Sequence, residues 1–342
     1  MTRRIASAFG AALMFATIHA AAPARADAVA DFYKGKTITI VVSFGAGGAY
    51  GLYTQLLARH LSKFVPGNPT FVPNYMPGAG GIKATNYIYN VAARDGSVIG
   101  IPPDTLVLSN VLTPDKVKYK SSDFRWIGAV VRSNNVLVMR SDAAKSMDDI
   151  AKKHTVVGGA GPGSPSIMMP LLLRWMTGGD MKVVAGYKGS GDIMIAIERG
   201  ELQGAVFGWT SWKSLRGKWL ESGWAVPIVQ FGVEKENDLA NIPLAHEITK
   251  TPEARKVVSF MSSSGAIGRS YVLPPKAPDD RLAALRTAFD KMVKDPEFLD
   301  DAKRRNAEIK PATGAWVQQK VEEAMKIDAA LAETARKAVF GK

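Results

Sequence analysis

The sequence predicts an α/β protein made of two lobes, with a parallel-type sheet in each lobe and a cleft between them. Three observations support this prediction. Short apolar segments alternate with helical ones, glycine-rich turns join them, and the pattern restarts about halfway along the chain. Such alternation is typical of a parallel sheet with helices on both faces. The 342 residues are enough for two domains of ordinary size.

Residues 1–26 are predicted to be a secretory signal peptide. Arginines at positions 3 and 4 precede an apolar run over residues 5–22, and Ala24-Arg25-Ala26 is a small-x-small cleavage site. The alternative is a membrane anchor, which needs about 20 solidly apolar residues, whereas this run is interrupted by His19. We therefore expect cleavage after Ala26 and a periplasmic mature protein.

The first lobe is predicted to begin with two strand-turn-helix units. The β-branched run TITIVVSF is typical of a strand buried on both faces. The expected elements are a strand at 37–44, a turn at 45–49, a helix at 50–63, a second strand at 69–73, a second turn at 77–81, a second helix at 82–93 and a third strand at 98–101.

A second series is predicted after the strand-like stretch over residues 126–139. Its elements are a helix at 147–153, a strand at 155–159, a loop at 161–166, a helix at 167–176, a strand at 182–187, a turn at 188–191, a helix at 192–199, and strands at 204–208 and 226–232. Helical composition returns from residue 278, ending in one amphipathic helix over 315–339. The predicted division is residues 27–128 plus 265–342 for lobe I and 129–264 for lobe II.

Charge and composition narrow the function classes. The chain contains no cysteine, which excludes disulfides, thiolate metal sites and cysteine nucleophiles. Loss of the three signal-peptide arginines would lower the formal net charge from +13 to +10. The basic residues are scattered without a nucleic-acid motif, so no nucleic-acid partner is expected. The positive field would draw small anions toward a cleft, although a basic exported protein needs no such purpose.

The glycine-rich turns are the candidate binding elements. They occur at residues 45–48, 78–81, 161–166 and 189–192, each before a predicted helix. Helix N-termini carry unpaired N–H groups that bind anions, and in open α/β sheets such turns lie where ligands bind. Any single turn could instead serve only a tight change of direction. Gly80 and the Ser164-Pro165-Ser166 run are the strongest candidates outside the first turn.

Two other residues are candidates with structural alternatives. Trp209 follows a predicted strand and is expected either to line the cleft or to fill the core. Asp104 is expected either to accept hydrogen bonds from a ligand or to cap a helix. Nucleotide, serine-hydrolase and zinc-protease motifs are absent, and the three histidines that remain after cleavage lie in polar settings. We therefore expect no catalytic residue, no cofactor and no metal site.

Four segments of the sequence resemble one family of receptors. They read VVSFGAGGAYGLYTQLLARHL, NYMPGAGGIKATNYIYNVAARDGSVIG, GAGPGSPSIMM and AGYKGSGDIMIAIERGELQGAVF. In order and spacing the chain from Thr37 to about Ala332 resembles the extracytoplasmic solute receptors of tripartite tricarboxylate transporters, often called Bug-type receptors. The resemblance implies a Venus-flytrap periplasmic binding protein that holds a small organic acid largely through main-chain N–H groups and water.

The resemblance also implies partners and contact residues. The partners are an organic-acid ligand and integral-membrane transporter subunits, and the receptor itself is expected to be a monomer. The contact residues, carried over by position, are Ala46, Gly47, Gly48, Ala49 and Tyr50 in the first lobe, Gly163, Ser164 and Ser166 in the second, and Lys188, Gly189 and Ser190 as a third wall.

Departures from the family pattern make the pocket more apolar. Gly51 stands where the family commonly has an aspartate, Met168 and Met169 where it often has a histidine, and Trp209 where it often has an acidic or amide residue. An aromatic or short aliphatic acid is therefore at least as reasonable a ligand as citrate. An exported enzyme acting on a carboxylated substrate and a sensory receptor of the same fold remain as alternatives.

Overall fold

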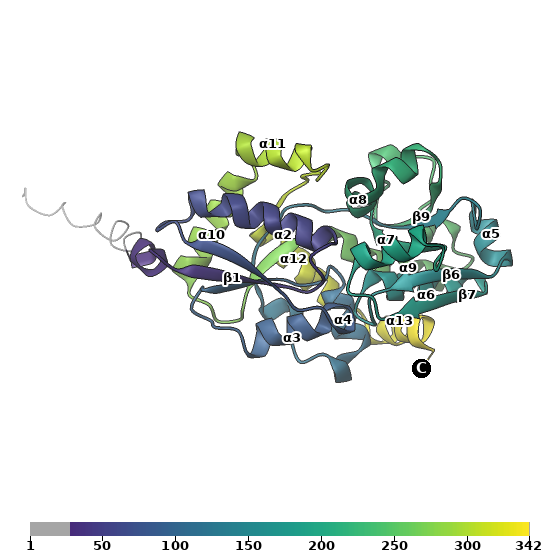
Figure 1. Ribbon diagram of the computed structural model, residues 1–342. Coiled ribbons are helices and arrows are strands. Elements are labelled where there is room, and N and C mark those ends of the chain that lie inside the picture. The colour runs from purple at the N-terminus through teal and green to yellow at the C-terminus, as the bar shows by residue number, and fades with distance from the viewer. Residues whose placement is uncertain (1–27, 342) are drawn as a thin grey trace, which may run out of the picture.

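The computed structural model describes residues 28–341, so the predicted signal peptide at residues 1–26 lies outside the described residues. Figure 1 shows two lobes side by side, each built around its own sheet. Within residues 28–341, no helix is both long enough and apolar enough to cross a bilayer.

Lobe I contains a six-stranded sheet of order β11-β4-β10-β3-β1-β2. Strands β1, β2 and β3 pair in parallel, whereas β10 runs antiparallel to both β3 and β4. The elements are β1 (Thr37–Val42), α2 (Ala49–His60), β2 (Thr70–Tyr75), α3 (Ile82–Asn90), β3 (Val98–Ile101), α4 (Leu106–Leu112), β4 (Arg125–Ala129), β10 (Ser270–Leu273), α10 (Asp279–Met292), α11 (Pro296–Arg304), β11 (Ala312–Thr313) and α12 (Gly314–Met325).

Lobe II contains a five-stranded sheet of order β7-β6-β8-β5-β9. Strands β6, β7 and β8 are parallel, and β5 runs antiparallel to β8 and β9. The elements are β5 (Asn135–Arg140), α5 (Met147–Lys152), β6 (Thr155–Gly159), α6 (Pro165–Thr177), β7 (Met181–Ala185), α7 (Ser190–Glu198), β8 (Gly204–Gly208), α8 (Trp209–Glu221), β9 (Ala225–Phe231) and α9 (Pro252–Ser262), with α13 (Ala329–Phe340) packed on them.

The two sheets share one strand order. In each, the first strand of a parallel trio lies between the second and the third, and an antiparallel strand follows beside the third. That antiparallel strand, β10 or β5, is in both cases the first strand after the chain has crossed from the other lobe. Each lobe therefore contains the predicted parallel strands, but as part of a mixed sheet. The two sheets have the same topology.

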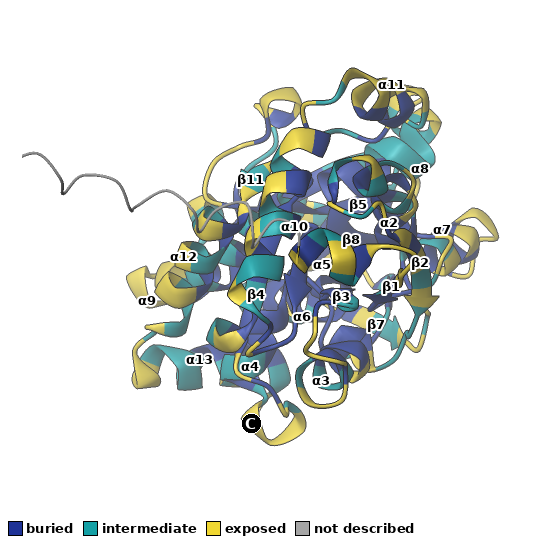
Figure 2. Ribbon diagram, turned by 90° about the vertical axis from the view of Figure 1, so that its left-hand side faces the viewer, coloured by how far each residue is buried: buried dark blue, intermediate teal, exposed yellow. Residues whose placement is uncertain are grey.

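Both faces of the lobe I sheet are covered. Ile38, Ile40 and Val42 of β1 belong to an apolar cluster with α2 and α10, whereas Val41 belongs to one with α3, α4 and α12. A strand whose alternate side chains are both buried reads as a continuous apolar run, as the sequence of β1 does. Figure 2 shows central strands such as β3 and β8 as mostly buried, and the edge strand β2 and the outer sides of helices such as α9 and α11 as largely exposed or intermediate.

The strand-like stretch over residues 126–139 is divided between the lobes. β4 ends at Ala129 in the first sheet and β5 begins at Asn135 in the second, so residues 130–134 form a crossover. The return crossover lies between the end of α9 at Ser262 and the start of β10 at Ser270. These two segments connect the lobes at the base of the cleft.

The C-terminal helix differs from its prediction in two ways. The single helix expected over 315–339 is two helices, because the carboxylate of Asp328 accepts a hydrogen bond from Leu331 N and caps α13. In addition, α13 packs on α6 and α9 and places Ala335 and Val339 in the lobe II core, so assigning all of 265–342 to lobe I was wrong. Figure 1 shows α13 in yellow beneath lobe II. Its apolar face packs against α6 there.

Candidate functional site

The glycine-rich loops of the two lobes touch across the cleft. Gly45 N donates a hydrogen bond to the carbonyl oxygen of Lys188 over 3.0 Å, and Gly163 N donates to the carbonyl oxygen of Ala79 over 3.1 Å. Ala49 N donates a hydrogen bond to Ser190 Oγ over 3.3 Å. All four turns selected from the sequence therefore meet at one place, and the lobes are closed on each other.

The loops of the two lobes can approach this closely only because glycine occupies particular positions in them. A Cβ placed on Gly191 of lobe II would lie 2.5 Å from the carbonyl oxygen of Gly47 in lobe I. A Cβ on Gly80, whose φ is +67°, would lie 2.5 Å from Ser164 N. Separations this short are incompatible with van der Waals contact, and the positive φ at Gly80 independently favours glycine. The closed arrangement thus requires residues without a side chain at this boundary.

Behind these contacts the lobes enclose a cavity of about 30 Å³, which we call the interlobe cavity. A water molecule needs about 10–15 Å³ by this kind of measure, so the closed cavity has room for one or two waters. A larger ligand therefore requires the lobes to stand further apart. The lining residues are Phe44, Gly48, Tyr50, Ala160, Ser164, Pro165, Ser166, Gly189, Ser190, Phe207, Gly208, Ser211 and Arg269.

Arg269 contributes the positive charge of the interlobe cavity. It lies in the return crossover directly before β10, and 6% of its surface is exposed. Its Nη2 donates to Ser211 Oγ over 3.2 Å, and its Nη1 lies 3.4 Å from both Tyr50 Oη and Asp104 Oδ2. Its Nε is buried and has no hydrogen-bond partner among residues 28–341. The guanidinium is thus held by long bonds on one side and unsatisfied on another.

Asp104 lies behind Arg269 and does not line the cavity. Its Oδ2 accepts hydrogen bonds from Arg269 and, over 3.4 Å, from Asn135 Nδ2, whereas its Oδ1 has no partner in the described part of the chain. Burial raises the pKa of the Asp104 carboxyl, and the nearby Arg269 opposes this rise only in part. The pair therefore forms a buried ion pair in which the carboxylate is incompletely satisfied.

Tyr50 joins the glycine loop to this ion pair. Its hydroxyl accepts a hydrogen bond from Asp104 N over 2.9 Å, and the Arg269 guanidinium lies 4.2 Å from the centre of its ring. Burial raises the pKa of the Tyr50 phenol, so the hydroxyl stays protonated at neutral pH. The aromatic face thereby supports the arginine without adding a charge.

The serine loop supplies the opposite wall at the start of α6. Ser164 is the N-cap residue, Pro165 occupies the first helical turn, and Ser164 Oγ lies 2.9 Å from Ser166 Oγ. Ser164 Oγ also donates to the carbonyl oxygen of Gly161, and Ser166 Oγ accepts from Ala160 N. The positive end of the helix dipole and two hydroxyls thus face Arg269 across the cavity, an arrangement suited to an anion.

The structure distributes the predicted site residues over three positions. Those that line the interlobe cavity are Gly48, Tyr50, Ser164, Ser166, Gly189 and Ser190. Those at the loop contact between the lobes are Ala49, Gly80, Gly163 and, by its carbonyl group, Lys188. Those outside the cavity are Ala46 and Gly47, which are exposed, and Asp104, which lies behind Arg269.

Trp209 does not line the interlobe cavity, so its predicted place there was wrong. Its indole Nε1 donates to the carboxylate of Asp238 over 2.9 Å, and its ring packs in the lobe II core with Trp212. Helix α8 begins at Trp209, and within its first turn Ser211, not the indole, reaches the cavity. Of the two placements expected for Trp209, the structure shows the one in the core.

Sequence reasoning missed Arg269 and the aromatic walls formed by Phe44 and Phe207. The sequence gives only a weak indication that Arg269 is buried and paired. This arginine stands between Gly268 and the apolar strand β10, where a charged side chain needs a buried partner. No signal identifies the partner, since Asp104 is 165 positions away. Phe44 and Phe207 sit at the ends of apolar strands and resemble ordinary core residues.

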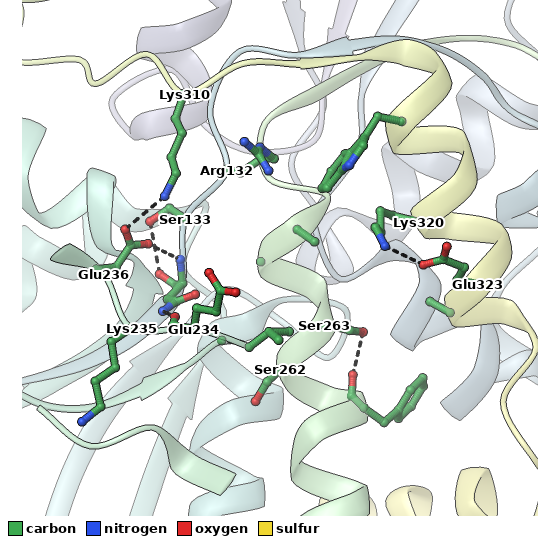
Figure 3. Close-up of a pocket in the computed structure, with 18 of the residues that line it drawn as sticks. Arg132, Ser133, Glu234, Lys235, Glu236, Ser262, Ser263, Lys310, Lys320 and Glu323 are labelled. Atoms are coloured by element: carbon green, nitrogen blue, oxygen red, sulfur yellow. Dashed lines mark hydrogen bonds and ion pairs between the residues drawn. The ribbon is translucent and has the colours of Figure 1, made fainter. Parts of the chain in front are cut away.

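A larger concavity of about 710 Å³ lies at the crossovers. Figure 3 shows two ion pairs among its charged groups: Lys310 Nζ is 3.8 Å from Glu236 Oε2, and Lys320 Nζ is 2.7 Å from Glu323 Oε2. The Arg132 guanidinium lies 4.7 Å from the centre of the Trp316 ring. Five basic side chains and only three acidic ones line it, but none of the four glycine-rich loops does, so we assign the ligand to the interlobe cavity instead.

Metal chemistry has no evident site in residues 28–341. This range contains no group of three or more histidine and carboxylate side chains placed to hold a metal ion. The residues that face the interlobe cavity are mainly glycines, serines and aromatic residues around one arginine. Such a lining is suited to holding a small anion.

Comparisons with known proteins agree with this architecture. No protein-family model matches the chain, and no curated protein matches its sequence significantly. Among solved structures, the periplasmic binding protein BugD is similar with a TM-score of 0.69 at 20% identity, over 90% of this chain and 98% of that one. An R. palustris protein solved with adipate gives 0.67 at 21% identity, over 88% and 97%.

A third solved structure extends the comparison. MatC from Rhodopseudomonas palustris, solved with bound malate, gives a TM-score of 0.68 at 19% identity, over 87% of this chain and 99% of that one. Together with the paired sheets, the crossovers and the cavity between the lobes, these likenesses identify the fold. The chain has the two-lobed fold of the periplasmic binding proteins.

Proposed function

We propose that this protein is a Bug-type periplasmic receptor that captures a small carboxylate and delivers it to a membrane transporter of the tripartite tricarboxylate kind. The observation that carries the proposal is the interlobe cavity, where a buried arginine faces the serine N-terminus of α6. Cationic and N–H groups on opposite walls of a small cavity between the lobes favour an organic anion.

The closing of the lobes fits a receptor. Glycine loops of both lobes form direct backbone hydrogen bonds that exist only when the cleft is shut. A ligand that touches both lobes would stabilise a shut arrangement, with the lobes slightly further apart than in the present structure, relative to the open one, by as much as its affinity differs between them. A transporter subunit could then distinguish the loaded receptor from the empty one by shape.

The solved structures add support at the level of fold. Two of the similar proteins were solved with dicarboxylates, adipate and malate. We infer a carboxylate ligand for this chain from its own cavity, export and a periplasmic location from the sequence pattern, and a monomeric state from the resemblance to the receptor family. Among the carried-over residues, we propose ligand contacts for those that line the cavity.

A thermal-shift screen tests the proposal. The chain from residue 27 onward would be screened against organic acids, amino acids, sugars and simple cations, because a ligand that binds only the native state raises the melting temperature. A rise with organic acids, and recovery of the acid unchanged after long incubation, is the expected result. Conversion of the acid would favour the enzyme alternative, and a rise only with sugars or cations would refute the carboxylate.

A further inference from the structure

We infer that the interlobe cavity selects a monocarboxylate whose remaining part is apolar, in preference to a dicarboxylate. This inference rests on the proposed function and narrows its ligand class. Arg269 is the only charged side chain that lines the cavity in the structure of residues 28–341. Its charge is already opposed by Asp104, whose Oδ2 lies 3.4 Å from Nη1.

The free edge of the guanidinium defines the position of one carboxylate. Nη1 faces Asp104 and Tyr50, whereas Nε is buried with no partner among residues 28–341 and Nη2 holds a 3.2 Å bond to Ser211. Nε and Nη2 together form the planar fork that binds both oxygens of a carboxylate. Gly208 keeps space beside this edge, since a Cβ there would come within 3.1 Å of Nη2.

A second carboxylate would have no counter-charge. The rest of the lining consists of aromatic and small apolar residues, together with serine hydroxyls and glycines. Burying an ionised carboxylate without a cation is strongly unfavourable. The side chain of Lys188, in the adjoining loop, is exposed and lies outside the cavity lining.

The walls favour an apolar body on the ligand. Phe44 and Tyr50 lie with ring centres 4.5 Å apart and their planes tilted by 45° on the lobe I side, and Phe207 lies on the lobe II side. Aromatic walls of this kind bind apolar or aromatic groups. The ligand class is therefore an aliphatic or aromatic acid with a single carboxylate.

Isothermal titration with matched acids tests this inference on the chain from residue 27 onward. Hexanoate would be compared with adipate, butanoate with succinate, and benzoate with terephthalate, so that each pair differs by one carboxylate. We expect the monocarboxylate of the best pair to bind about 100-fold more tightly. Equal or tighter binding of the dicarboxylate overturns the inference but leaves the proposed function standing, whereas binding of no acid overturns both.

Two variants test how the charges of Arg269 and Asp104 affect ligand binding, and a third serves as the control. Arg269→Gln should weaken monocarboxylate binding about 100-fold. The isosteric Asp104→Asn removes the opposing charge, so it should lower the monocarboxylate preference about tenfold by admitting dicarboxylates better. Lys188→Ala should leave the preference unchanged. An unchanged preference in Asp104→Asn, with a wild-type melting temperature, or a lost preference in Lys188→Ala, would overturn the assignment.

Discussion

Arg269 Nη1 and Asp104 Oδ2 lie 3.4 Å apart, both buried, at the base of the interlobe cavity. The two residues come from different parts of lobe I, a loop after β3 and the return crossover. A buried ion pair of this kind adds little to stability, since desolvation offsets the attraction. Because the pair lies beside the interlobe cavity, we propose that it acts in binding instead.

The pH dependence of ligand binding should follow Asp104. Burial raises the pKa of Asp104 above its ordinary value of 3.8. On acidification, Asp104 is therefore protonated at a higher pH than an exposed aspartate. Protonation removes the charge that opposes Arg269, so a carboxylate anion should bind more tightly as the pH falls through that raised pKa. Titration calorimetry from about pH 8 to about pH 5 measures this.

The control for the pH effect is Asp104→Asn. Its affinity should be nearly independent of pH over the range in which the ligand remains ionised, because the titrating group is gone. Affinity that falls on acidification in the wild type, with the ligand still ionised, would contradict the coupling between Asp104 and the ligand.

Closure of the lobes should depend on Gly191. In Gly191→Ala the new methyl group would meet the carbonyl oxygen of Gly47 only when the lobes are shut, at 2.5 Å in the present arrangement. We expect at least about tenfold weaker ligand binding, because the closed state loses about 1.4 kcal/mol or more, while the melting temperature without ligand stays nearly unchanged. Small-angle X-ray scattering with ligand should show a more open molecule.

Gly47→Ala is the matched control. Gly47 belongs to the facing loop, but a Cβ there meets no atom within 4 Å. This variant should bind and close like the wild type. Equal effects from both substitutions would show that the loop, and not the contact between lobes, is responsible.

Acid stability of lobe I should depend on Asp301. Its buried carboxylate lies 2.7 Å from Arg59 Nη1, 3.1 Å from His60 Nε2 and 2.9 Å from Arg305 Nε. Burial alone would raise the pKa of Asp301, but hydrogen bonds from His60 and Arg305 outweigh it and hold the pKa well below 3.8. The stabilisation is therefore full at neutral pH and is lost as the pH falls from about 3.8 toward that lower pKa.

Denaturant unfolding of Asp301→Asn measures this contribution. The variant should lose about 2 kcal/mol of unfolding free energy at pH 7, and the difference from the wild type should shrink as the pH falls below about 3.8. Asp300→Asn, an exposed neighbour on the same helix, should have little effect. A pH-independent loss would indicate a packing defect rather than loss of charge.

The assignment of α13 to lobe II predicts a second effect on stability. Ala335 is fully buried against the α6 and α9 cluster, so Ala335→Asp would bury an unpaired carboxylate and cost about 3 kcal/mol or more. Ala330→Asp, on the exposed side of the same helix, should cost little. Proteolysis should then cut the Ala335→Asp variant faster in lobe II than in lobe I; equal cutting of both lobes would contradict the assignment.

Much of the first lobe could be predicted because its elements are locally encoded. Thr37–Val42 is a continuous apolar β-branched run, and the glycine turns that follow the strands start helices where the structure has them. A lobe boundary was predicted at residues 128/129, within the stretch over residues 126–139, but the end of β4 at Ala129 and the start of β5 at Asn135 were not, because the two strands have the same apolar composition. Only pairing with different sheets shows that the chain crosses between them.

The candidate site was predicted in its backbone loops and missed in its side chains. Gly48 and Ser164 carry local signals, a glycine turn and a helix cap, and both line the cavity. Trp209 was placed wrongly because a residue at a strand end can face either the cavity or the core. The direction in which α8 begins decides between these, and that direction depends on packing against lobe II.

The sequence by itself determined the α/β class, the alternation of strands and helices, and the glycine loops, because hydrophobic period and backbone freedom act over neighbouring residues. Only the tertiary structure decided the antiparallel strands, the place of α13 and the pairing of Arg269 with Asp104. These depend on contacts between residues far apart in the chain, whose partners are selected by burial and charge after the lobes have formed.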